Sequence, residues 1–164
     1  MSVVLRLATL FGFALTLSAA SALIESRAEG RFSVPERGEA MLIDFRPDSI
    51  RNWKISQARL YLFLTSGKAP EKLPLSTVTV NWTEENPTEA AKGAFGKLGS
   101  TEEHCPVKQL PQGWIEVQLP PTFLEALAAG KSFGLAWLTG PSRINGRSPV
   151  FRQPYILAEG APAK

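Results

Sequence analysis

The chain has 164 residues, and its 18 lysines and arginines exceed its 15 aspartates and glutamates, for a formal net charge of +3 at pH 7. This small excess argues against a nucleic-acid-binding protein, which would carry a concentrated basic face. Cys105 is the single cysteine, so the chain forms no internal disulfide and depends on packing for its stability. The length fits one domain.

Residues 1–22 have the pattern of a secretory signal peptide. Arg6 gives a positive start, Leu7–Leu17 is apolar, and Ala20-Ser21-Ala22 is a small-x-small cleavage site. The alternative is a retained anchor, because the apolar run extends to Ile24, but polar and small residues interrupt it. We therefore expect cleavage after Ala22, a secreted, extracytoplasmic protein in the periplasm or outside the cell, and no membrane contact after cleavage.

Two runs of alternating residues, Ala58–Thr65 and Ser76–Trp82, dominate the middle of the chain. Side chains alternate between the two faces of a strand, so each run presents one apolar row. The segment between them, residues 66–74, contains glycine and proline and is predicted to be a loop. We expect the two runs to be neighbouring core strands. With Trp137 from a later strand, the predicted structural core comprises Leu60, Leu62, Leu64, Val78, Val80 and Trp82.

The remainder of the chain is predicted to form short strands separated by turns, with a connector at residues 23–31, a long loop at 83–101 and a disordered tail at 159–164. The further strands are expected at Arg31–Val34, Ala40–Arg46, Val107–Leu110, Trp114–Leu119, Phe133–Leu138 and Val150–Ala158. Pro154 interrupts the last of these, which suggests a bulge or an edge.

One short helix is predicted at Thr122–Gly130. Thr122 and Glu125 have the spacing of a capping box, and Gly130 is placed to end the helix in a left-handed conformation. A helix of about two turns is stable only when it docks on a core. Its inward stripe is expected to be Leu124, Leu127 and Ala128.

The order of these blocks resembles the DNRLRE-type domain of secreted bacterial proteins, which is grouped with jelly-roll carbohydrate-binding modules. The resemblance lies in Ile55–Leu62, Val78-x-Val80-x-Trp82-x-Glu84, Trp114–Val117, Phe133–Ala136, Ser148–Phe151 and Pro154–Leu157. It implies an all-β jelly-roll β-sandwich of about eight strands with one short helix, over residues 32–158. The second tryptophan that the family often has after Trp-x-Glu is missing here.

A sugar ring stacks its C–H groups on an exposed aromatic plane, while polar neighbours bind its hydroxyl groups. The outward positions of the predicted strands have this composition, and we expect the candidate carbohydrate-binding residues to be Arg59, Tyr61, Asn81, Trp114, Glu116 and Gln118. In the alternative, a loop or the helix covers Tyr61 and Phe63, which then form a second small core.

The sequence gives little support for catalysis, and a hydrolase is the weakest of three hypotheses. His104 and Cys105 are adjacent, so they would point in opposite directions from an extended segment. No set of zinc ligands is present, and no pattern indicates a cofactor or a structural calcium ion. We therefore expect a non-catalytic module that binds extracellular or cell-surface polysaccharide, and no nucleic acid. The alternative is a structural or adhesive envelope protein whose sandwich face binds protein.

Overall fold

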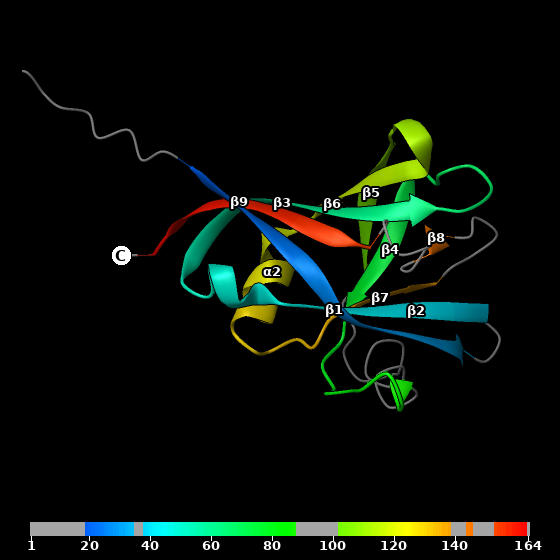
Figure 1. Ribbon diagram of the computed structural model, residues 1–164, viewed down its shortest axis with the longest axis horizontal. Helices are drawn as coiled ribbons and strands as arrows, with labels where there is room; N and C mark the ends of the chain where they lie inside the picture. The colour runs from blue at the N-terminus through cyan, green and yellow to red at the C-terminus, as the bar shows by residue number, and fades with distance from the viewer. Residues whose placement is uncertain (1–18, 35–37, 88–101, 139–143, 146–152, 164) are drawn as a thin grey trace, which may run out of the picture.

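The computed structural model describes residues 19–34, 38–87, 102–138, 144–145 and 153–163 (Figure 1). Its strands are β1 (Ala20–Val34), β2 (Gly38–Phe45), β3 (Trp53–Leu64), β4 (Lys72–Thr77), β5 (Glu102–Gln109), β6 (Trp114–Leu119), β7 (Leu135–Leu138), β8 (Ile144–Asn145) and β9 (Tyr155–Pro162). The helical elements are α2 (Pro121–Ala128) and two 3-10 turns, η1 (Pro47–Ile50) and η2 (Pro111–Gly113). The predicted all-β class with one short helix is confirmed for these residues.

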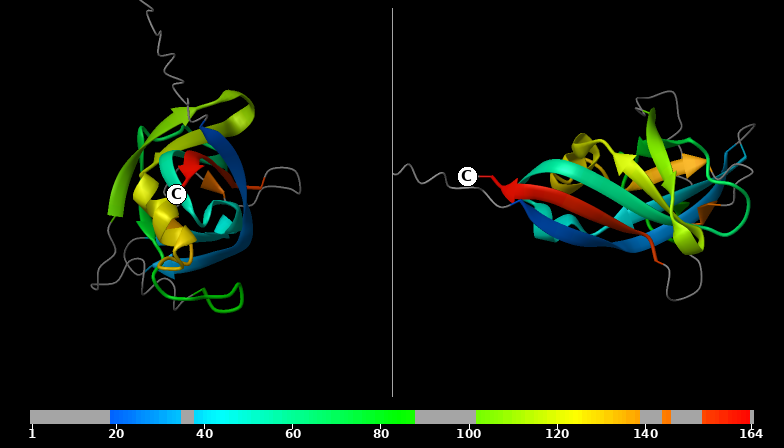
Figure 2. Two further views of the ribbon diagram at one scale, coloured as in Figure 1. Left: turned by 90° about the vertical axis from the view of Figure 1, so that its left-hand side faces the viewer. Right: turned by 90° about the horizontal axis from the view of Figure 1, so that it is seen from above.

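The strands close into a barrel instead of the expected two-sheet sandwich. The order β6-β5-β4-β7-β2-β1-β9-β3 returns to β6, every neighbouring pair is antiparallel, and the two-residue β8 adds to β3. Figure 2 shows the ring almost end-on. Alternating sequence patterns cannot distinguish the two folds, because a barrel and a sandwich both bury every second residue.

Two strands make the closure, because each changes its partner halfway along. β1 pairs with β9 through residues 20–25 and with β2 from Ser26 onward, with a register shift between Ser26 and Ala28. β5 pairs with β4 through residues 102–106 and with β6 through residues 107–109. Such irregularities bend a strand, so they allow one sheet to curve round and meet itself.

The barrel interior is filled by side chains from every side of the ring. The leucine row of β3, Leu60, Leu62 and Leu64, is buried there as predicted, and Trp137 of β7 is fully buried in the same cluster. Helix α2 adds Phe123, Leu124 and Leu127 to this core, and it packs against β3 and η1. The interior is therefore a packed core.

A second, smaller apolar cluster lies on the outer side of β2 and β7. β4 ends at Thr77, so the chain leaves the barrel before Val80, which is 38% exposed; its prediction as a core residue is wrong. Val78 and Trp82 are buried, but against Ala40, Leu42 and Ala136 and not among the β3 leucines. The indole N–H of Trp82 donates to the carbonyl oxygen of Phe133 at 2.8 Å.

The two central strands are not neighbours, contrary to expectation. β3 pairs with β6, β8 and β9, whereas β4 pairs with β5 and β7. The predicted loop also ends early, since β4 begins at Lys72 and buries Leu73 and Leu75. Pro74 between them lies opposite His104 and made this segment resemble a loop.

Both expected ends of the domain lie within paired strands. Residues 23–31, expected as a connector, belong to β1, and residues 159–162 of the expected tail belong to β9. The predicted cleavage site also falls in β1, where Ala20, Ser21 and Ala22 pair with Gly160, Glu159 and Ala158. The expected strand at 150–158 is described only from residue 153, and most of the long loop, residues 88–101, also lies outside the described residues.

Helix α2 forms where predicted but without the predicted cap. Its N-cap is Pro120 and no side chain caps it, so the expected Thr122–Glu125 box is wrong. A proline at the first helical position supplies a helical φ and lacks an N–H that would need a partner. Gly130 adopts φ +67°, which confirms the predicted left-handed end. No helix among the described residues is long and apolar enough to cross a membrane.

Candidate functional site

The outer surface of β9, β3 and β6 carries five of the six predicted site residues. In register, Tyr155 lies beside Tyr61, which lies beside Glu116, and the adjacent row runs from Leu157 through Arg59 to Gln118. Phe63 pairs with Trp114 at the next outward position. We call this surface, with Tyr61, Phe63, Trp114 and Tyr155 at its centre, the outer aromatic face.

The four rings form a continuous cluster. Tyr61 and Tyr155 stack with centroids 4.7 Å apart and an interplanar angle of 10°. Trp114 meets Tyr155 edge-on at 5.8 Å and Phe63 edge-on at 5.7 Å. Offset and edge-on arrangements suit the ring quadrupoles, so each contact stabilises the cluster beyond its buried area. The mutual stacking also covers one face of each tyrosine.

Phe63 is the buried member of the cluster, at 7% exposure, while Tyr61, Trp114 and Tyr155 are half-buried. Gly113 packs closely against the ring of Phe63. A β-carbon at position 113 would lie only 2.9 Å from the Cζ atom of that ring. The alternative of a second small core therefore applies to Phe63. The other three rings keep part of their surface open to solvent.

Polar groups border the rings, and many are already paired with one another. The hydroxyl of Tyr61 donates to Glu116 Oε2 at 2.8 Å, and Arg59 forms an ion pair with Glu159 of β9. The amide of Gln118 donates to the carbonyl oxygen of Ala58 at 3.3 Å. These contacts fix the side chains, which favours a preformed surface over a flexible one.

Burial and a neighbouring carboxylate shift the tyrosine titrations. Burial, with the hydrogen bond to Glu116 and its negative charge, raises the pKa of Tyr61 to about 12. Burial also raises the pKa of Tyr155, and the charge of Glu116 adds to it. A phenolate at either position would lose hydration and face a carboxylate, so both hydroxyls remain protonated donors at neutral pH.

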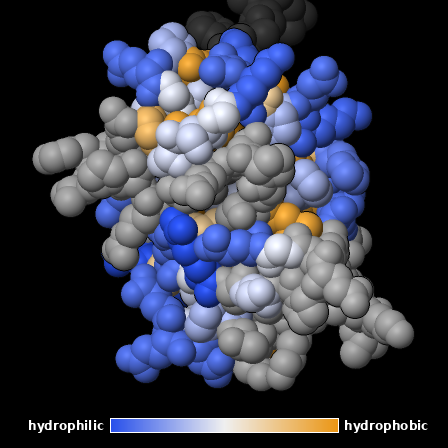
Figure 3. Space-filling view, turned by 90° about the vertical axis from the view of Figure 1, so that its right-hand side faces the viewer, coloured by the Kyte–Doolittle hydropathy of each residue, from blue (hydrophilic) through white to orange (hydrophobic). Residues whose placement is uncertain are grey.

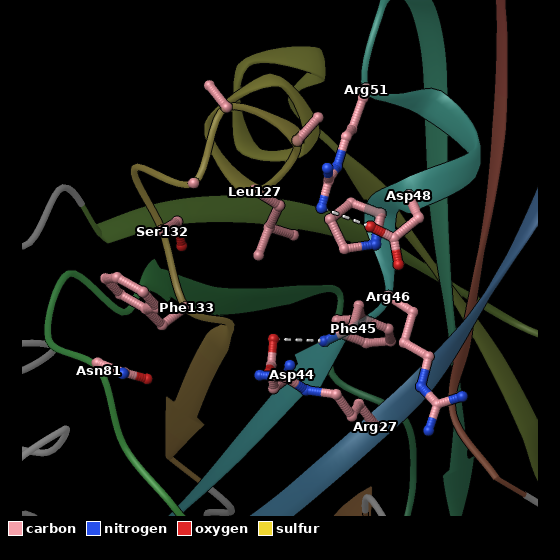
Figure 4. Close-up of a pocket in the computed structure, with 14 residues that line it drawn as sticks. Arg27, Asp44, Phe45, Arg46, Asp48, Arg51, Asn81, Leu127, Ser132 and Phe133 are labelled. Atoms are coloured by element: carbon pink, nitrogen blue, oxygen red, sulfur yellow. Dashed lines mark hydrogen bonds and ion pairs between the residues drawn. The ribbon is translucent and has the colours of Figure 1, made fainter.

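Asn81 lies elsewhere, although we predicted it as part of the same surface. It follows β4, outside the barrel, and lines a separate pocket with Arg27, Asp44 and Phe133 (Figure 4). The reason is again that β4 ends at Thr77, so alternation no longer assigns a face to residue 81. The six predicted residues therefore do not form one site.

Sequence reasoning missed Tyr155 and Glu159, which complete the outer aromatic face. Pro154 suggested a break in the last strand, so its outward positions were not assigned. Strict alternation along the strand was the available signal. The structure follows it, because Ile156, Ala158 and Gly160 are buried while Tyr155, Leu157 and Glu159 are half-buried.

His104 and Cys105 of β5 do not form a reactive pair. His104 is exposed, whereas Cys105 is a buried free thiol, so the two side chains point to opposite faces of the strand. Burial, with a contribution from the charge of Glu103, raises the pKa of Cys105 to about 11. Within the described ranges, no group of three or more histidine, cysteine, aspartate or glutamate side chains is placed to hold a metal ion.

The end of the molecule drawn in Figure 3 is mostly hydrophilic where it is coloured, with apolar residues in small separate patches. Patches of that size are ordinary on a protein surface. No protein-family model matches this chain, and none of the curated proteins compared with it does either.

Proposed function

We propose that this protein is a secreted, non-catalytic module that binds extracellular or cell-surface polysaccharide through the outer aromatic face. The observation that supports this most directly is the joining of three half-open rings, Tyr61, Trp114 and Tyr155, into one cluster across three strands. Sugar rings bind to aromatic planes in positions that polar side chains border, and Glu116 and Arg59 border this cluster.

The rigidity of the face suits an extended, repetitive ligand. The residues lie on strands and hold one another in place, so little side-chain entropy is lost when a ligand binds. The face is built from outward positions of three adjacent strands, so we expect it to bind several sugar units weakly instead of enclosing one tightly. A bound polysaccharide would gain affinity from repeated contacts along its length.

The test is retention of the purified protein on a panel of insoluble neutral and acidic polysaccharides. We expect Trp114→Ala to weaken retention about tenfold, which corresponds to roughly 1.4 kcal/mol. Val80→Ser removes an exposed apolar side chain outside the face and is the matched control. The proposal would be overturned if Trp114→Ala has an unchanged thermal melt and is retained as strongly as the unmodified protein. It would also be overturned if the unmodified protein is retained on none of the polysaccharides.

A second candidate, docking of an envelope protein on the same face, is favoured by one specific observation. Leu23 of β1 is 56% exposed and lies in register with the outward Leu157 of β9, beside the aromatic cluster. Exposed aliphatic side chains are more useful for protein contacts than for sugars. Protease treatment of envelope fragments separates the two functions, because binding to a protein is lost and binding to a polysaccharide persists.

A further inference from the structure

The pocket that contains Asn81 has a volume of about 810 Å³. It lies outside the barrel, between the end of β2, the turn η1, the C-terminal end of helix α2 and the segment at Ser132 and Phe133 (Figure 4). This volume falls within the range of pockets that bind small molecules.

Arginines outnumber carboxylates among the residues that line this pocket. Each carboxylate already has a cationic partner: Asp44 is paired with Arg27, and Asp48 with Arg51 at 2.7 Å. Arg46 has no ion-pair partner among the described residues, and its guanidinium extends away from Asp44 in Figure 4. The lining therefore carries one more arginine than carboxylate, with the Arg46 guanidinium directed outward at its edge.

The paired arginines retain donors for a ligand. A guanidinium has five N–H donors, and Arg27 uses its Nη2 group to bind Asp44, so other N–H groups of Arg27 stay available. Asp44 already accepts one hydrogen bond on each oxygen, from Arg27 at Oδ2 and from the backbone N–H of Phe45 at Oδ1. Its side chain is 8% exposed, so it presents little negative surface to an incoming anion.

The opposite wall is largely apolar and is formed by Leu127, Ala128 and Phe133. The exposed Asn81 at its edge offers an amide that can donate to or accept from a ligand. We propose that this pocket binds a small organic acid, whose carboxylate contacts the arginines while its carbon skeleton packs on the wall of helix α2. Planar guanidinium groups suit carboxylates, because they form two parallel hydrogen bonds with them.

This inference does not depend on the proposed function, since the outer aromatic face lies on β9, β3 and β6. The experiment is titration calorimetry of the full chain with three probes: galacturonate, galactose and inorganic sulfate. Galactose has the same sugar ring without the carboxylate, and sulfate has the charge without the ring. We expect galacturonate to bind at least about tenfold more tightly than either.

Ala129, exposed on the pocket wall, allows a test of charge in both directions. Ala129→Lys should tighten galacturonate binding and Ala129→Asp should weaken it, each by roughly fivefold, because an added charge acts on the carboxylate with opposite sign. Arg46→Gln should also weaken binding, whereas Lys54→Gln, an equal loss of charge on β3, should not. The exposed positions of these side chains make unfolding of the variants unexpected.

Equal affinities for galacturonate and galactose would overturn the inference, as would equal affinities of the two Ala129 variants. Sulfate binding as tight as galacturonate binding would overturn the role of the apolar wall and show a site for inorganic anions.

Discussion

Tyr61 on β3 and Tyr155 on β9 stack as a cross-strand pair, with ring centroids 4.7 Å apart and planes within 10° of parallel. The contact joins two strands that are almost one hundred positions apart in the sequence. It also places the hydroxyl of Tyr61 beside Glu116, so the titration of Tyr61 reports on the outer aromatic face.

The first prediction concerns stability at alkaline pH. The pKa of Tyr61 is raised from 10.0 to about 12, so the folded state keeps a proton that the unfolded state loses. The contribution of Tyr61 to stability is therefore complete below pH 10 and is lost as the pH rises toward 12. Tyr61→Phe should flatten the fall in the free energy of unfolding across this window, measured by denaturant titration at several pH values.

Glu116→Gln provides the control for that experiment, because it removes the carboxylate and keeps a hydrogen-bond acceptor. Phenolate absorbance in this variant should show Tyr61 titrating at lower pH, since the repulsion by Glu116 is gone. An unaltered titration would mean that Glu116 does not act on the tyrosine.

A second prediction concerns the ion pair between Arg27 and Asp44. Burial raises the pKa of Asp44, and the charge and hydrogen bond of Arg27, with the backbone N–H of Phe45, only partly oppose it. Arg27→Gln should lower the free energy of unfolding at pH 7 by about 1–2 kcal/mol, because it leaves a buried carboxylate uncompensated. Asp44→Asn should cost less, because Arg27 is 55% exposed and can be hydrated.

The pH dependence gives an independent check on this pair. A raised pKa means that the protonated carboxyl suits the fold better, so Asp44 favours stability below pH 3.8 and loses that contribution as the pH rises through its folded pKa. The deficit of Arg27→Gln should therefore shrink when Asp44 is protonated in acid. A deficit that is equal at all pH values would contradict this account.

The sequence predicted the interior of the barrel better than its outer surface. The burial of Leu60, Leu62 and Leu64 was predicted correctly. In a long strand that alternates, only one of the two faces is apolar enough to be buried. Val80 and Asn81 were misassigned because alternation was continued past Thr77, where the strand ends. A strand end depends on its partners, and those partners are distant in the sequence.

Closure of the barrel could not be predicted either. It depends on β1 and β5 changing partners along their length, and pairing between distant segments has no local signature. The outer aromatic face was partly predictable, since β3 and β6 alternate cleanly. Tyr155 was not assigned to it, because Pro154 made the start of β9 resemble an interruption.

A third prediction concerns the single cysteine. The pKa of Cys105 is raised from 9.0 to about 11, so the thiolate fraction near neutral pH falls by about a hundredfold. Cys105 is also buried, so an aromatic disulfide reagent should react slowly with the folded protein and rapidly in denaturant. Rapid, complete labelling of the native protein would show that Cys105 is accessible.

The last prediction concerns Gly134, which precedes β7. Its φ is +134°, and a β-carbon there would collide with the carbonyl oxygen of Ile43 and lie 3.0 Å from the carbonyl carbon. Both atoms are backbone in the neighbouring strand, so neither can move without disturbing the β2–β7 pairing. Gly134→Ala should therefore lower the free energy of unfolding by at least about 2 kcal/mol, measured by chemical denaturation.

Gly130 is the matched control, because it also has a positive φ, +67°, but has nothing within 4 Å of an added β-carbon. Gly130→Ala should cost only the conformational penalty of a left-handed alanine, about 1 kcal/mol. The difference between the two variants isolates the steric collision with Ile43 from the backbone preference. Equal losses would mean that β2 and β7 separate easily at this point, contrary to the close packing of the barrel wall.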